Sequence, residues 1–196
     1  MKCQVRDLMS ITSPTKFQIS IILFFSRIGR RFIYPRFVEE MGLKGGENVL
    51  DFGSGWGDNE YYIAPKLNTG GRVTAMDVSE EWQEVAKNRL RMFHNVDFML
   101  SDVRTSSLKD GSFDVIVVSY VLHDIPQEER AEIVTNLVRK MRPDGFLQLR
   151  EPTGKHHGMP VDEIRSLMRK AGMRETFSKF KRKEFRARYA LTDRSS

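Results

Sequence analysis

The stretch that decides the fold is residues 49–58, which read VLDFGSGWGD. Its apolar first residues predict a short buried strand, and Gly53, Gly55 and Gly57 follow where that strand passes into a helix. Because a glycine has no Cβ, the backbone can take positive φ angles and its amides can approach a ligand closely. We therefore expect a ligand to bind at this turn.

Strands and helices alternate outward from the turn. The spacing of apolar and turn residues predicts further strands at 72–77, 96–100, 113–119 and 146–150, and helices at 56–67, 80–92, 127–141 and 161–171. The first of these helices is expected to be interrupted near Pro65. Two last strands, 176–180 and 184–191, flank a short basic turn and suggest an antiparallel hairpin. This order predicts an α/β fold, a doubly wound Rossmann-like sandwich whose mostly parallel seven-stranded sheet carries an antiparallel C-terminal strand at one edge.

The composition is that of a folded protein with a single domain. Hydrophobic residues make up 40% and charged residues 30% of the 196 residues, which argues against disorder. The formal charge of +6 comes from basic residues near both ends, which indicate either a solvated edge or a face for nucleic acid or an anionic membrane. The single cysteine, Cys3, excludes an intrachain disulfide and a cysteine-based metal site, so we expect a cytoplasmic protein.

The segment ahead of the first core strand has the pattern of an amphipathic helix. Apolar residues recur at three- and four-residue steps from Phe17 to Phe32. We expect residues 1–44 to form a helical lid or cap and residues 45–196 to form the Rossmann-like core of the same domain. Core packing of the helix and peripheral docking on an anionic membrane are the alternatives. The apolar run 19–25 is too short to span a bilayer.

Carboxylates follow three successive predicted strands. Asp51 precedes the glycine turn, and Asp77 lies 77 − 53 = 24 residues beyond Gly53, close to the roughly 20 residues typical of a carboxylate that binds a ribose. Asp102 follows the third strand, where it can accept from the exocyclic amine of adenine while Val103 offers its backbone amide. An acid beside the turn suits an ammonium better than a phosphate. S-adenosylmethionine, which carries an ammonium and a sulfonium, fits this set.

These motifs resemble the class I S-adenosylmethionine-dependent methyltransferases, especially the small enzymes that modify quinones, sterols and metabolites. The resemblance covers about residues 45–172 and rests on a Val, Ile or Leu followed by LDxGxGxG, with Asp77, Asp102, the strand 113–116 and the turn 141–146 in the same order. It implies S-adenosylmethionine as the cofactor. The residues expected to bind the cofactor are Tyr34, Asp51, Gly53, Ser54, Gly55, Gly57, Asp77, Val78, Asp102, Val103 and Ser119.

The resemblance also gives the N-terminal segment a role. In similar enzymes such segments fold over the cofactor, which would allow Tyr34 to hydrogen-bond the methionine carboxylate with Arg31 nearby.

His123 is the candidate general base. It follows the predicted strand 113–119, which in this fold borders the transferable methyl, and a neutral imidazole can take a proton from a hydroxyl. His123 and Glu151 are placed as in the plant-type and hydroxyindole O-methyltransferases, whose histidine in the matching position is the base. Many small relatives carry a histidine here that packs the loop, so a structural role is the alternative.

The expected function is methyl transfer to oxygen, nitrogen or carbon of a small-molecule or lipid-like acceptor. The non-enzyme alternative is a cofactor-binding regulatory or partner subunit, and the oligomeric state stays open. An aminopropyltransferase would need paired aspartates after the fourth strand, where only Asp124 is present. Nucleic acid is not an expected substrate, because no Asn-Pro-Pro-Tyr-like motif follows that strand. No metal is expected either, because the adjacent His156 and His157 do not make a metal site.

Overall fold

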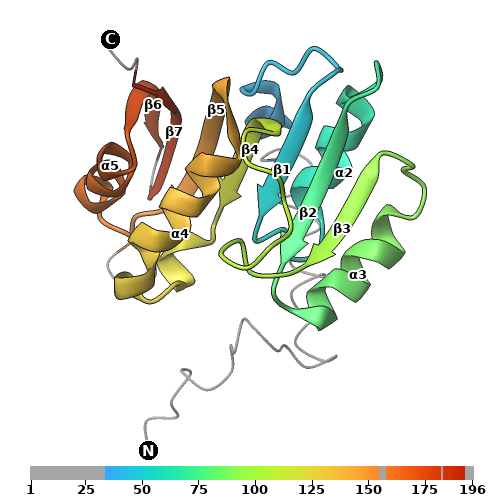
Figure 1. Ribbon diagram of the computed structural model, residues 1–196, viewed down its shortest axis with the longest axis horizontal. Coiled ribbons are helices and arrows are strands. Elements are labelled where there is room, and N and C mark those ends of the chain that lie inside the picture. The colour runs from blue at the N-terminus through green and yellow to red at the C-terminus, as the bar shows by residue number, and fades with distance from the viewer. Residues whose placement is uncertain (1–33, 155–157, 182, 193–196) are drawn as a thin grey trace, which may run out of the picture.

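The computed structural model describes residues 34–154, 158–181 and 183–192. They form a seven-stranded sheet with the strand order β3-β2-β1-β4-β5-β7-β6 (Figure 1). The strands are β1 (Asn48–Phe52), β2 (Arg72–Asp77), β3 (Val96–Leu100), β4 (Phe113–Ser119), β5 (Met141–Pro152), β6 (Met173–Lys181) and β7 (Glu184–Leu191). Because β1 pairs in parallel with both β2 and β4, the strand order reverses at β1, and open sheets bind ligands at the carboxyl ends of such strands.

The last two strands form the antiparallel hairpin that the sequence predicts. β7 runs antiparallel to β5 on one side and to β6 on the other. The α/β class, the mostly parallel sheet and the antiparallel C-terminal strand are confirmed. The edge placement is wrong, because β6 forms the edge and the reversed strand β7 lies inside the sheet. After β5 the chain first forms β6 at the edge of the sheet and leaves the position next to β5 empty. The hairpin then places β7 in that position, between β5 and β6.

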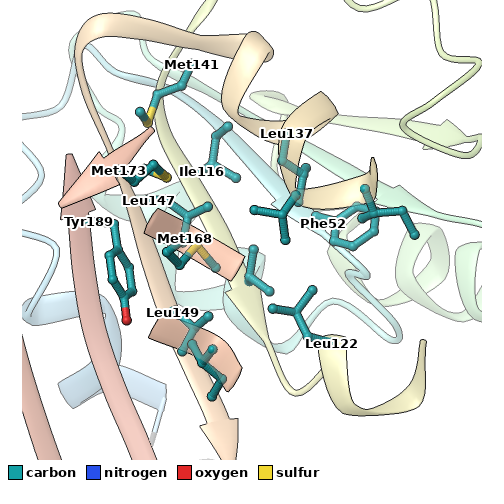
Figure 2. Close-up of a cluster of buried hydrophobic side chains, with 14 of the residues drawn as sticks. Phe52, Ile116, Leu122, Leu137, Met141, Leu147, Leu149, Met168, Met173 and Tyr189 are labelled. Atoms are coloured by element: carbon teal, nitrogen blue, oxygen red, sulfur yellow. The ribbon is translucent and has the colours of Figure 1, made fainter. Parts of the chain in front are cut away.

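Helices cover both faces of the sheet. They are α2 (Asp58–Ile63), α3 (Glu80–Leu90), α4 (Gln127–Lys140) and α5 (Val161–Lys170), with 3₁₀ turns η2 (Ala64–Lys66) and η3 (Leu122–Asp124). On one face α4, α5 and β7 contribute to a core that contains Leu137, Met168 and Tyr189 (Figure 2). On the other face α2 and α3 contribute Ile63 and Leu90 to a second core. The central strands are therefore buried on both sides, as parallel strands usually are.

Local sequence sets the ends of several elements. Ser79 begins α3, since its hydroxyl accepts from the backbone amide of Trp82. Pro65 lies in η2, so the helix predicted over 56–67 is regular only as far as Ile63. The strand predicted over 146–150 begins earlier and ends later because its pairing with β4 and β7 continues past the apolar run.

Residues 34–39 are helical, and they belong to the segment predicted as a lid. Phe37, Val38 and Met41 are buried in the second core, so this part of the segment packs against the sheet. The helix predicted from Phe17 to Phe32 lies outside the described residues, and its role as a lid or membrane contact stays a prediction. Over the described ranges, no helix is long and apolar enough to cross a membrane.

Candidate functional site

A cavity of about 520 Å³ lies at the carboxyl ends of β1, β2, β3 and β4, and its volume is typical of a small-molecule site. Its lining contains these residues that the sequence predicts at the cofactor: Tyr34, Gly53, Ser54, Gly55, Asp77, Val78, Asp102 and Ser119. The candidate base His123 lines the same cavity. Asp51, Gly57 and Val103 are not part of the lining. The structure therefore brings most of the predicted site together around one space.

The glycine turn is shaped by close packing. Gly53 and Gly55 have φ angles of 71° and 53°. A Cβ on Gly53 would lie 2.4 Å from a methyl carbon of Val121, so this position has no room for a side chain. Gly57 has a different role, because a Cβ there would lie 2.6 Å from Leu90 of α3. Gly53 allows the turn to pass beneath the loop after β4, whereas Gly57 allows α3 to pack closely.

Asp77 is held in place by the backbone of the turn that it faces. Its Oδ2 accepts from the Gly55 amide at 2.8 Å, and its Oδ1 accepts from the Ser79 amide at 2.9 Å. Burial raises the pKa of Asp77, although these two amides act in the opposite direction. Each carboxylate oxygen has a second lone pair, so Asp77 can still accept from two hydroxyl groups in the cavity.

Two further oxygen atoms at the cavity have unused acceptor capacity. Ser54 Oγ and Asn59 Oδ1 are buried and have no hydrogen-bond partner among the described residues, although both side chains line the cavity. A buried polar atom without a partner is costly, so such atoms indicate a group that the structure does not contain. An ammonium, which only donates, suits these atoms. The residues present therefore fit the amino end of S-adenosylmethionine.

Asp51 lies beneath this wall. It is fully buried, and Asn59 Nδ2 donates to its two oxygens at 3.0 and 3.3 Å. Burial raises the pKa of Asp51 to about 7. The carboxyl of Glu60, also fully buried, lies beside it, and burial together with Asp51 raises the pKa of Glu60 well above its ordinary value. Asp51 thus supports the wall through Asn59, and its contact with the cofactor stays a prediction.

Asp102 is engaged by a residue that the sequence reasoning missed. Arg104 donates to Asp102 from its backbone amide, from Nε and from Nη2, the last at 2.6 Å, and pairs with Glu129 at 2.7 Å. The Arg104 guanidinium holds the pKa of Asp102 below its usual range. If Asp102 accepts from adenine as predicted, it does so while it is also paired with Arg104. Val103 is buried in the first core, so only its backbone could serve the site.

Apolar side chains form the rest of this part of the wall. Trp56 and Trp82 line the cavity with ring centroids 5.1 Å apart. Val78, beside Asp77, is 58% exposed and offers an apolar surface next to that carboxylate. Flat apolar surfaces beside hydrogen-bonding groups are typical of sites for a nucleoside or another ring-containing ligand.

His123 is oriented by a buried acid. Its Nδ1 lies 2.7 Å from Glu151 Oε2, while Glu151 Oε1 accepts from the amides of Val121 and Leu122 at 2.8 Å. Burial alone would lower the pKa of His123, but the hydrogen bond and charge of Glu151 outweigh it and raise the pKa above its usual value. Nε2 lies 3.4 Å from Asp124 Oδ2. The arrangement suits a base, and it equally stabilises the loop after β4.

Tyr120 belongs to the segment after β4 and was given no role of its own by the sequence, and it lines the cavity. It is a non-glycine residue with a positive φ, 60°, and its amide donates to the carbonyl of Arg150 at 2.8 Å. Strained residues of this kind are concentrated at functional sites. The tyrosine itself gave no signal, because its conformation depends on a bond to β5. Among the residues that the structure describes, no group of three or more His, Cys, Asp or Glu side chains could hold a metal.

Comparison with known proteins agrees with this geometry. Residues 49–145 match the protein family described as "Methyltransferase domain". The chain is 27% identical over 117 residues to a ubiquinone/menaquinone biosynthesis C-methyltransferase of Hydrogenovibrio crunogenus, a match that covers 58% of this chain and 45% of that protein. It is 25% identical over 155 residues to a demethylmenaquinone methyltransferase of Staphylococcus saprophyticus, which covers 78% and 65% of the two chains.

Solved structures share the fold. A crystal structure of a SAM-dependent methyltransferase from Aquifex aeolicus aligns with a TM-score of 0.72 and 24% identity, over 83% of this chain and 92% of that one. The chain spans less than two thirds of the length of the two quinone-pathway relatives named above.

Proposed function

We propose that this chain, whose residues 49–145 match the methyltransferase-domain family, transfers the methyl group of S-adenosylmethionine to a small or lipophilic acceptor. The bound sulfonium supplies an activated methyl group, so the protein has mainly to bind, orient and exclude water.

The observation that carries this proposal is the position of Asp77 against the glycine turn. The amides of Gly55 and Ser79 hold its carboxylate in one orientation at the cavity wall. A ribose diol can donate to the two lone pairs that remain. The unpartnered atoms Ser54 Oγ and Asn59 Oδ1 lie on the same cavity wall, where they suit the ammonium of the methionine part.

The apolar part of the cavity supports a lipophilic acceptor. Ile125, Pro126 and Ile133 line it, as does His123. The two relatives named for quinone biosynthesis make a ring-containing acceptor a reasonable class. If the acceptor atom is a hydroxyl oxygen, Nε2 of His123 takes its proton while Nδ1 stays hydrogen-bonded to Glu151.

Calorimetry with S-adenosylmethionine and S-adenosylhomocysteine tests the cofactor half of the proposal. Binding of both in the micromolar range is expected, and failure of both to bind at about 1 mM would reject it. A labelled methyl donor and a pooled metabolite and lipid extract then test turnover. Transfer of label is expected, whereas tight nucleoside binding without any labelled acceptor would favour a regulatory or partner subunit.

A further inference from the structure

Arg150, on β5, is a buried cation whose hydrogen-bonding capacity is largely unused. The residue is 2% exposed, and its Nε and Nη1 have no hydrogen-bond partner within the described part of the chain. The nearest carboxylate oxygen, Oε2 of Glu184, is 3.7 Å from Nε, which is too long for a hydrogen bond. Glu184 is also committed elsewhere, because it accepts from Arg186 and from the hydroxyl of Tyr120. A buried guanidinium in this state indicates a missing anion.

Aromatic rings surround the guanidinium, and Arg150 itself is not part of the cavity lining. Its central carbon lies 4.5 Å from the ring centroid of Tyr34, 4.6 Å from that of Tyr120 and 5.1 Å from that of Phe37. Ring contacts stabilise a cation without satisfying its N–H groups, and the hydrogen bond between Arg150 and the Tyr34 hydroxyl still leaves Nε and Nη1 without a partner among the described residues. Tyr34 and Tyr120 both line the cavity. Small movements of these two rings would therefore expose Arg150 to a ligand.

The surrounding charge is also positive. Side chains of β5, β6 and β7, which lie side by side in Figure 1, bring Arg150, Lys179 and Arg186 around two carboxylates, Glu40 and Glu184, while Arg188 donates to the backbone carbonyl of Glu40. The hydroxyl of Tyr34 also faces Asp58, but Asp58 is paired with Arg89 at 2.7 Å. Arg150 also acts electrostatically on the buried Asp51, so four cations face three acids, and an added anion would balance the remaining positive charge.

We propose that Arg150 binds a carboxylate of the methyl acceptor, so that the acceptors of this protein are organic acids. The inference rests on the proposed function. Arg150 lies on β5, on the far side of β4 from the Asp77 end of the cavity, and Tyr120 is next to it. The Tyr120 ring lies 6.2 Å, centroid to centroid, from the ring of His123. A carboxylate anchored at Arg150 would place the rest of the acceptor along Tyr120 toward His123.

The test compares acids with their neutral amides. Benzoate, phenylacetate and hexanoate, and the corresponding amides, are titrated into protein saturated with S-adenosylhomocysteine. The wild type should bind the acids at least about ten-fold more tightly than the amides, since hydrogen bonds to a charged group are strong. R150M should lose this preference, R150K should keep part of it, and the control R72M, at an exposed arginine paired with Asp97, should keep all of it. Equal binding of acids and amides by the wild type, or an unchanged preference in R150M, overturns the proposal.

A second arm separates the acceptor from the cofactor, which also carries a carboxylate. If R150M weakens S-adenosylhomocysteine about ten-fold but leaves its decarboxylated analogue unaffected, the anion at Arg150 is that of the cofactor and the acceptor assignment is overturned. Circular dichroism of R150M and R150K checks the fold, and R150K alone decides if R150M does not fold. If the wild type binds no nucleoside, the proposed function fails, while the same titration without nucleoside still reports whether Arg150 binds acids.

Discussion

The carboxyl groups of Asp51 and Glu60 lie within hydrogen-bonding distance of each other, and neither residue is exposed. Two carboxylates cannot share such a bond unless one of them carries a proton. Asn59 donates to Asp51, whereas no other described residue donates to the Glu60 oxygens. The proton therefore belongs on Glu60, which then donates to Asp51.

This pair makes stability depend on pH. The folded pKa values of both acids are raised, so the folded protein keeps a proton that the unfolded chain releases near pH 4. Stability should therefore fall as the pH rises from about 5 to about 8, by about 1 kcal/mol or more. The Gln side chain in E60Q still donates to Asp51 but takes up no proton. The free energy of unfolding of this variant, measured with urea, should therefore depend much less on pH. The control is E84Q, because Glu84 is exposed. If the free energy of unfolding varied with pH in the same way in E60Q as in the wild type, the idea that Asp51 and Glu60 share a proton would be contradicted.

Substitution of Gly53 should damage both stability and binding. G53A places a methyl group 2.4 Å from Val121 at a position whose φ is 71°, and we expect it to cost about 2 to 4 kcal/mol and to weaken S-adenosylhomocysteine binding. The matched control is G111A, because Gly111 also has a positive φ, 64°, but no atom within 4 Å of the added carbon. G111A should cost only about 1 kcal/mol. Thermal unfolding and calorimetry measure the two effects, and equal losses in the two variants would show that backbone strain alone matters.

Of the carboxylates at the cavity, Asp77 should be the one whose substitution weakens nucleoside binding most. D77N removes the charge and turns one oxygen, which accepts from Gly55 or Ser79, into an amide that cannot accept. We expect S-adenosylhomocysteine to bind at least about ten-fold more weakly. D97N, at a half-exposed aspartate paired with Arg72 outside the cavity, should change binding less than about two-fold. Unchanged affinity in D77N, measured by calorimetry, would remove the ribose contact from the proposal.

The pairing of His123 with Glu151 predicts the pH dependence of turnover. The raised pKa means that His123 must lose a proton before it can act as a base, so the rate with a hydroxyl acceptor should rise through a pKa above about 6.5. E151Q removes the charge that raises this pKa and should shift the rise to lower pH. The same pair should stabilise the fold fully below about pH 6.5 and progressively less above the raised pKa.

H123A separates the two roles of this histidine. A loss of about 100-fold or more in turnover at saturating acceptor is expected of a general base. Unchanged turnover together with a lower melting temperature would assign His123 to packing of the loop after β4.

The fold was readable because the patterns that define it are local. Apolar runs bounded by turn residues placed β2, β3, β4 and β7 with the bounds that the structure shows. The bounds of β5 and β6 were too short because pairing with neighbouring strands, rather than their own side chains, carries them further. The interruption predicted near Pro65 is confirmed, since the regular helix α2 ends at Ile63 and the proline lies in the 3₁₀ turn η2.

The sequence predicted the candidate site to about the same extent as the fold. The glycine turn and the aspartates at strand ends follow from the order of residues along the chain, since parallel strands bring their carboxyl ends to one rim. The approach of Arg104 to Asp102 could have been suspected from their two-residue spacing. The contacts of Glu151 with His123 and of Arg150 with Tyr34 join residues far apart in the chain. Only a resemblance to O-methyltransferases linked the first pair, and no local pattern linked the second.

By itself, the sequence determined an α/β sheet with a ligand turn between β1 and α2 and acids at successive strand ends, because hydrophobic periodicity and glycine placement act over a few residues. Only the tertiary structure decided which polar atoms are satisfied and which are not. It paired Asp102 with Arg104, brought the carboxyl groups of Asp51 and Glu60 together, and left Nε and Nη1 of Arg150 without a hydrogen-bond partner among the described residues. The physical reason is that hydrogen bonding and desolvation depend on neighbours that the fold brings together from distant parts of the chain.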